Sequence, residues 1–312
     1  MKDKIDMHIH SYVSDGDYTT KKIVELIKES GVKTFSLTDH DTIMGNFEII
    51  EHLDEGMEFI TGVEMTAFIE KGELHILGYD IDLNNKELKK ELANQDNLAR
   101  FRVKMLLSYL KEVFEIEFSK EEESALLNKK GNVGRPEVGK LLIKHGYASS
   151  VREAFAKYLI EAHNNIKGAI DYLSGEEIIA LIKGAGGIPV LAHPIFLQKP
   201  IDELDEYIGE LNRYGLMGIE VYHSKQSIEY SEKMLEIADK YDLLVSCGSD
   251  YHGPSVKPDV FIGKVANNQL EVNNVSLIDY IRSRWFYVRR CIMYFKKVKW
   301  KRLWCIYCRW LS

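Results

Sequence analysis

The N-terminal stretch IDMHIHSYVSDGDYTTKKIVELIKESGVKTFSLT, residues 5–38, predicts a strand, a helix and a second strand in succession. Apolar and polar residues alternate over residues 5–9, as they do in a strand. Thr20 is placed to cap a helix whose apolar residues share one face, and Gly31 ends it. Residues 34–38 then form the second strand. Such a unit is typical of a largely parallel sheet flanked by helices.

The same alternation continues beyond this unit on both sides of a long helical stretch. Further strands are predicted at residues 59–63, 64–69, 74–79, 188–192, 218–222 and 243–247. Long amphipathic helices fill the region between residues 85 and 165, including one over residues 98–113. The count of six or seven βα units leaves a barrel and a doubly wound sheet open. We therefore expect a discontinuous α/β domain at residues 1–84 and 175–279, interrupted by a helical insertion at residues 85–174.

The last 33 residues differ in composition from the rest of the chain. Residues 280–312 contain ten Lys and Arg but no Asp or Glu, so residues 1–279 carry a net charge of −17. This segment also holds all four tryptophans and three of the four cysteines. It resembles a basic aromatic segment for RNA or an anionic membrane surface. The abrupt change favours the alternative that it is an atypical tail, read out of frame from near Arg284.

Length and composition indicate a folded protein of ordinary make-up. The 312 residues are 45% hydrophobic with a formal charge of −7, which excludes disordered and fibrous classes. We find no apolar run of about 18 residues and no apolar signal-peptide core at the start. Four cysteines do not make a disulfide framework in a chain this long. We expect a cytoplasmic protein without membrane contact and without an obligate protein partner.

Histidines and acids follow the predicted strands at the points where these end or begin. His8 and His10 lie at the end of the first strand and project to one side. The other candidates lie after or beside later strands, and they are Asp15, His40, Glu64, His75, His193, Asp250 and His252. Because the carboxyl ends of parallel strands gather at one face, we expect nearly all nine side chains to converge there.

The residue types of this set indicate an open catalytic metal site. Imidazole and carboxylate ligands without thiolate suit Zn²⁺, Mn²⁺ or Fe²⁺ better than they suit a closed structural zinc site. Nine ligands are too many for one ion, and a shared carboxylate is the usual bridge between two ions about 3.5–4 Å apart. His52, His145 and His163 lie in amphipathic or inserted segments, and we assign them no chemistry.

Five short motifs resemble, in order, those of the PHP (polymerase and histidinol phosphatase) superfamily. They are Asp6-Met7-His8-Ile9-His10-Ser11, Thr38-Asp39-His40-Asp41, Gly62-Val63-Glu64, Ala192-His193-Pro194 and Gly248-Ser249-Asp250-Tyr251-His252-Gly253. The resemblance covers residues 1–265 and implies a distorted (β/α)7 barrel with a trinuclear metal site for phosphoester hydrolysis. It implies three ligand groups: His8, His10, Glu64 and Asp250; Glu64, His75 and His193, with Glu64 bridging; and Asp15, His40 and His252.

Asp15 in place of a histidine, the insertion and Gly134-Arg135-Pro136 resemble one group of that superfamily. This group comprises 3′,5′-nucleoside bisphosphate phosphatases and a 5′–3′ oligoribonuclease. Arg135 would grip a non-scissile phosphate with its guanidinium, although an exposed arginine at a helix start is an equally good reading. The chain departs from the group at Glu137, where a histidine is usual, and at Gln226, where a second histidine often follows His223.

The resemblance predicts hydrolysis of phosphate esters of nucleotides or short RNA 5′ ends by a metal-bound hydroxide, with two or three divalent ions. Asp250 is both a predicted ligand and a catalytic residue, and His223 is the candidate acid for the leaving alcohol or a phosphate ligand. One alternative is a histidinol-phosphatase-like monophosphatase. Another is a nucleic-acid-binding protein with a vestigial metal site whose basic tail binds RNA.

Overall fold

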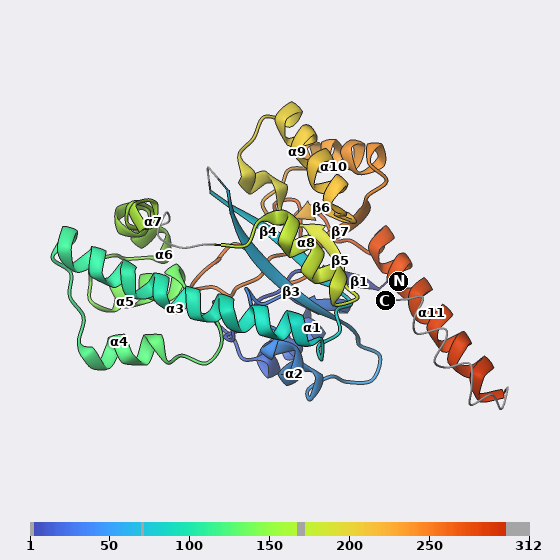
Figure 1. Ribbon diagram of the computed structural model, residues 1–312, viewed down its shortest axis with the longest axis horizontal. Coiled ribbons are helices and arrows are strands. Elements are labelled where there is room, and N and C mark those ends of the chain that lie inside the picture. Colours follow the sequence, from blue (N-terminus) through green and yellow to red (C-terminus); the bar gives the residue numbers. More distant parts are fainter. Residues whose placement is uncertain (1–2, 70–71, 167–171, 298–312) are drawn as a thin grey trace.

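Seven strands form a nearly closed barrel at the centre of the molecule (Figure 1). The computed structural model describes residues 3–69, 72–166 and 172–297. The strands lie side by side in chain order: β1 (Lys4–Asp6), β2 (Val32–Leu37), β3 (Glu58–Ile69), β4 (Gly72–Tyr79), β5 (Ile188–Leu191), β6 (Gly218–His223) and β7 (Leu244–Gly248). The barrel closes where Met7 N donates to Cys247 O at 3.0 Å and Asp250 N donates to His8 O at 2.8 Å. Closure excludes the doubly wound alternative.

The sheet is parallel except around β4, which runs antiparallel to both neighbours. The strands predicted at residues 59–63 and 64–69 are one continuous strand, β3, because its pairing partner changes from β2 to β4 without a break. Its register with β4 places Thr66 opposite His75. The start of β4 therefore lies where the neighbouring parallel strands end, and this brings His75 to the same end of the barrel as the other candidates.

Helices pack around the outside of the barrel, as the apolar periodicity predicts. They are α1 (Thr20–Ser30), α2 (Met44–Ile50), α8 (Gly175–Gly184), α9 (Ile201–Tyr214) and α10 (Ile228–Lys240). Helix α1 is capped by Thr19, one residue before the predicted cap, and ends at Gly31 with φ 77°. A short 3-10 turn, η3 (Pro194–Leu197), follows β5. Strand and helix boundaries otherwise differ from the predictions by a few residues.

The inserted helices stand beside the barrel and have their own apolar core (Figure 1). They are α3 (Lys86–Phe114), α4 (Lys120–Leu127), α5 (Arg135–Lys144), α6 (Val151–Ala154) and α7 (Ile160–Ile166), with a π-helical turn at Phe155–Leu159. Helix α3 starts twelve residues before the predicted Leu98. Its first part packs on the barrel through Leu88 and Leu92, whereas Val103 and Leu107 belong to the inserted core. One long helix thus joins the two parts.

Helix α11 (Ser276–Lys297) contains the beginning of the basic segment. Ile281 is fully buried in the barrel core, and Trp285 donates from Nε1 to Asp80 Oδ1 at 2.9 Å. The segment is therefore bonded to the barrel at its start. The predicted out-of-frame tail starts near Arg284, and its residues 298–312, which include two of its cysteines, lie outside the described residues. No helix in the described part of the chain has the length and apolar character to cross a bilayer.

Candidate metal centre

Glu64 is the hub of the candidate site. Its carboxylate is fully buried, and histidine nitrogens approach both of its oxygens. Oε1 lies 2.9 Å from His75 Nδ1 and 2.9 Å from His193 Nε2. Oε2 lies 3.1 Å from the Nε2 atoms of both His8 and His10 and 3.2 Å from His40 Nδ1. The predicted position of Glu64 between two groups of imidazoles thus agrees with the geometry, whereas ion binding itself stays a prediction.

A second group of candidates surrounds Asp15. Its Oδ1 lies 3.2 Å from His252 Nε2, and its Oδ2 lies 4.0 Å from His40 Nε2. His10 Nδ1 is 3.8 Å from Asp15 Oδ1. His40 and His10 each present one ring nitrogen to Glu64 and the other to Asp15. The two groups are therefore contiguous rather than separate.

Asp250 completes the set from the loop after β7. Its Oδ1 faces His10 Nε2 at 3.4 Å, His252 Nδ1 at 3.2 Å and His8 Nε2 at 3.7 Å. Its Oδ2 points the other way. The structure therefore brings all nine predicted side chains together, and three sets of donors each lie within 4.8 Å of one another: His10, Asp15, His40 and His252; His8, His10 and Glu64; and His40, Glu64 and His75.

His10, His193 and Glu64 have the protonation states that divalent cations need. Burial, with the neighbouring His252 and His40, lowers the pKa of His10 to about 4, and burial lowers the pKa of His193 to about 4 although Glu64 opposes it. Burial alone would protonate Glu64, but the imidazoles around it hold its pKa well below the usual value. For His8 and His75, burial favours the neutral ring, but the neighbouring carboxylates, Glu64 first among them, outweigh it and raise the pKa. Neutral imidazoles and charged carboxylates are the forms that bind metal.

Two pairs of imidazole nitrogens face each other at short distance, and they show whether cations fit the site. His8 Nε2 and His10 Nε2 are 3.0 Å apart, and His75 Nδ1 and His193 Nε2 are 3.3 Å apart. Two neutral imidazole lone pairs aimed at each other repel unless a proton or cation lies between them. His40 Nδ1 is buried and forms no hydrogen bond, despite its proximity to Glu64. These residues fit two or three divalent metal ions held by nitrogen and oxygen.

Three buried acids hold the candidate ligands and their loops in place. No role was predicted for them from the sequence. Glu220 accepts from His8 Nδ1 at 3.0 Å and from His193 N at 2.7 Å. Asp39 accepts from Ser11 N at 2.7 Å, and Asp6 accepts from Ser249 N at 2.9 Å. A carboxylate in the middle of the predicted buried strand was the available signal for Glu220, because an unpaired charge there is costly.

The backbone around the site is strained. His193, with φ 23°, and Asp250, with φ 57°, adopt left-handed backbone angles that cost a non-glycine residue about 1–3 kcal/mol. Gly248 leaves room for the site, because a Cβ there would lie 2.2 Å from His8 Cβ and 2.8 Å from Glu220 Oε1. Strain of this kind persists only where the surroundings hold it, and it is typical of functional sites.

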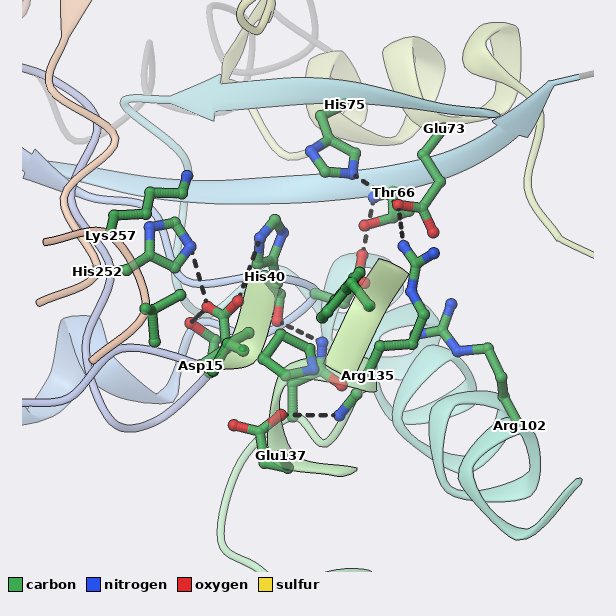
Figure 2. A pocket seen from close by; sticks show the side chains of 18 residues that line it. Asp15, His40, Thr66, Glu73, His75, Arg102, Arg135, Glu137, His252 and Lys257 are labelled. Atoms are coloured by element: carbon green, nitrogen blue, oxygen red, sulfur yellow. Dashed lines mark hydrogen bonds and ion pairs between the residues drawn. The ribbon is translucent and has the colours of Figure 1, made fainter. Parts of the chain in front are cut away.

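A cavity of about 250 Å³ opens beside Asp15, His40 and His75 and reaches the inserted helices. Figure 2 shows the guanidinium groups of Arg135 and Arg102 beside Glu73 on one wall. Arg135 Nη2 donates to Glu73, and its guanidinium lies 5.4 Å from the Phe155 ring centre. Burial opposes ionisation of Glu73, but Arg135, His75 and Arg102 together outweigh it and lower the pKa to about 2. Arg102 was not predicted, because an arginine inside a helix carries no local signal.

His223 lies behind Asp250 rather than in the cavity. Its Nε2 donates to Asp250 Oδ2 at 3.1 Å, while its Nδ1 accepts from Lys225 N at 3.1 Å. The ring is fully buried and lines neither cavity at the metal site. The geometry argues against its predicted roles as proton donor and phosphate ligand, since both nitrogens are engaged. It favours a role in orienting Asp250.

Lys257, which was not predicted, is a cationic side chain at the metal site. Its Nζ contacts Asp250 Oδ2, and the side chain lines both the cavity of Figure 2 and a second one of about 250 Å³. The sequence offered no distinction between this lysine and an ordinary loop lysine. Of the histidines without an assigned role, His145 lies 2.9 Å from Glu122 in the inserted helices, away from the metal site.

Comparison with known proteins places the chain among phosphoester hydrolases. A 5′-3′ exoribonuclease of Haemophilus influenzae is 29% identical over 255 residues, which cover 81% of this chain and 92% of that protein. A 3′,5′-nucleoside bisphosphate phosphatase of Chromobacterium violaceum is 27% identical and covers 80% of this chain, with 87% of its own length matched.

Solved structures agree with these relatives. A Bifidobacterium adolescentis protein, whose crystal structure is described as that of a metal-dependent phosphoesterase, matches with a TM-score of 0.72 and 30% identity. The match covers 86% of this chain and 93% of that one. The family profile of the PHP domain matches residues 6–178. This match extends over more than half of the 312 residues, and the chain therefore belongs to the PHP domain family.

Proposed function

We propose that this PHP-family phosphoesterase hydrolyses phosphate esters of nucleotides or of short RNA 5′ ends at a trinuclear metal centre. The observation that carries the proposal is the cluster of imidazoles around Glu64, which opens into a cavity walled by Arg135 and Arg102. A metal cluster and a guanidinium pair in one cavity suit a substrate with two phosphate groups. The exoribonuclease and the bisphosphate phosphatase among the relatives support this substrate class.

The metal ions would be divided among three ligand groups. These are His8, His10, Glu64 and Asp250; Glu64, His75 and His193; and Asp15, His40 and His252. Divalent ions bound there would activate water and neutralise charge on the phosphoryl oxygens. The carboxylate of Glu64 has one oxygen toward each of the first two groups, as a bridging ligand requires.

Arg135 and Arg102 would bind the phosphate that is not cleaved. A guanidinium offers two parallel N–H donors to phosphate oxygens, which suits recognition without chemistry. Glu73 holds Arg135 from one side and Phe155 packs against its face, so the fork is oriented before substrate arrives. Glu137 accepts from Gly134 N at 3.0 Å and thus fixes the helix start that carries Arg135.

Lys257 would bind the scissile phosphate. It is a cationic donor beside Asp250 that lines both cavities at the metal site. In the hydrolysis, a water oxygen bonds to phosphorus, the bond from phosphorus to the leaving alcohol oxygen breaks, and that oxygen takes up a proton. His223 would keep Asp250 in position from behind through its Nε2.

The test combines metal analysis with a substrate panel on one purified sample. The panel contains 3′,5′-bisphosphorylated nucleosides, 5′-phosphorylated short RNA and histidinol phosphate, each with added Mn²⁺. We expect the wild type to prefer the nucleotide substrates and His8→Ala, Glu64→Ala or Asp250→Ala to abolish turnover. His52→Ala, outside the site, is the control and should retain it. Turnover that survives the three site substitutions, or a preference for histidinol phosphate, would refute the proposal.

A further inference from the structure

Three cavities follow one another across the metal site. The cavity with Arg135 shares His40, His75 and Lys257 with the second cavity, which lies directly over Glu64. The second cavity in turn shares Phe196 with a third, larger one of about 1060 Å³. The third lies between η3, helix α9, the end of the β3–β4 hairpin and Asn164 of helix α7.

Phe196 stands at the junction with a face free for stacking. It is 46% exposed although its ring lies 4.9 Å from the His193 ring and 5.4 Å from the His223 ring. These two ring contacts leave nearly half of its surface open beside the metal site. A nucleic-acid base is a ligand that would cover it, because every base has a flat π-face.

The third cavity beyond Phe196 has the chemistry of a single-strand groove. Lys199 Nζ lies 5.3 Å above the Tyr207 ring, and Gln198 and Asn164 add hydrogen-bonding groups. Glu203 is the acidic group on the same wall. Its volume exceeds that of the Arg135 cavity about fourfold, so it has room for more than one nucleotide. The combination of aromatic faces and a cation suits a strand bound without base-specific contacts.

We propose that Phe196 and the groove along η3 and α9 receive the RNA strand on the 3′ side of the scissile phosphate. This rests on the proposed function and makes an oligoribonucleotide, rather than a mononucleotide, the preferred substrate. The 5′-terminal nucleotide occupies the Arg135 cavity, and the next base stacks on Phe196. Water adds to the bridging phosphorus, the bond to O3′ of the terminal nucleotide breaks, and O3′ takes a proton. The products are a nucleoside 5′-monophosphate and a 5′-phosphorylated RNA one residue shorter.

The same bond breaks in a 3′,5′-bisphosphorylated nucleoside, where the phosphorus carries no further strand. The ratio of kcat/KM for a 5′-phosphorylated trinucleotide to kcat/KM for the bisphosphorylated nucleoside therefore measures how much binding in the groove contributes to catalysis. We expect this ratio to exceed one in the metal-loaded wild type. Phe196→Ala should lower it about 10- to 100-fold, the loss expected for one stacked base. Phe196→Trp should retain most of it.

Lys199→Ala tests the groove independently of the junction. It should lower the ratio several-fold at low salt and flatten the dependence of trinucleotide kcat/KM on salt, because one phosphate contact is lost. Phe261→Ala, an aromatic that is 55% exposed and lines none of the three cavities, is the matched aromatic control. Lys233→Ala on α10 is the matched lysine control. Both should leave the ratio unchanged.

The outcomes separate this inference from the proposed function. If the wild type cleaves the bisphosphorylated nucleoside but the ratio is unchanged in Phe196→Ala and Lys199→Ala, the groove assignment is wrong and the proposed function stands. If the wild type cleaves neither substrate, both fail. Metal content is measured on each variant, because Phe196 touches His193. Should Phe196→Ala fail to fold, Phe196→Leu keeps the apolar volume without the π-face and is judged by the same ratio.

Discussion

Replacing Glu220 by Gln should weaken metal binding although Glu220 is not a predicted ligand. Both of its oxygens accept hydrogen bonds, one from His8 Nδ1 at 3.0 Å and one from His193 N at 2.7 Å. The first bond keeps the proton of His8 on Nδ1 and leaves the Nε2 lone pair aimed at Glu64 and His10. Glutamine has only one acceptor oxygen, so one of the two donors must face an NH₂ group.

The size of the effect follows from this lost bond. A hydrogen bond to a charged group in a buried place contributes about 1.5–3 kcal/mol, and loss of such an outer partner typically costs 10- to 100-fold in metal affinity. Glu220 is fully buried, so water does not replace the lost acceptor. We therefore expect the Kd for Mn²⁺ or Zn²⁺ to rise about 10- to 100-fold in Glu220→Gln, with hydrolysis reduced at limiting metal and partly restored by excess.

Competition with a chelator of known affinity measures the Kd directly, and thermal unfolding of the metal-free proteins checks that the fold is intact. Glu229→Gln, an exposed residue on α10, is the matched control and should bind metal as the wild type does. A Kd for Glu220→Gln within twofold of the wild type, in a protein that is folded, would show that Glu220 does not orient the ligands.

Two further predictions concern stability. Chelation of the metal should lower the Tm, because the buried carboxylates of Glu64, Asp15 and Asp250 lose their counter-charge. Metal at 100 times its Kd should raise the free energy of unfolding by about 2.7 kcal/mol. A Tm that calorimetry finds unchanged after chelation would contradict a metal centre. Arg282 holds the pKa of Glu58 below its usual value, so this pair stabilises above about pH 4.5 and its contribution disappears as the pH falls through the lowered pKa. Arg282→Ala should therefore cost under about 1 kcal/mol at pH 7 and progressively less as the pH falls below about 4.5, and a loss that does not change with pH would disprove the electrostatic account.

The alternation of strands and helices was readable because apolar periodicity is local. Helix α9 has the predicted bounds, and the strands of the second half differ by one residue at most. The prediction was wrong where tertiary pairing overrides the local pattern, as in β3, which was split into two strands at Glu64. Long helix α3 was cut short for a related reason, since its first turns pack on the barrel rather than in the insertion.

The candidate ligands could be predicted because strand ends converge in any βα barrel. The groups that orient them could not. Glu220 bonds His8, which is 212 residues away in the sequence. Lys257 reaches Asp250 from the loop that follows it. The position of His223 at a strand end does not reveal which neighbour occupies each ring nitrogen, so its contacts with Asp250 and Lys225 could not be predicted.

Residue types and their order along the chain were thus sufficient for the fold class, because it depends on short-range periodicity. The domain bounds and the choice of imidazoles and acids as metal ligands, which rest on composition and strand-end position, stay predictions. Which oxygen of Asp250 faces the histidines, which arginines share a cavity and where Phe196 lies depend on side chains from separate elements that meet only in the folded protein. Those contacts depend on distances of a few tenths of an ångström, and no local pattern in the chain encodes them.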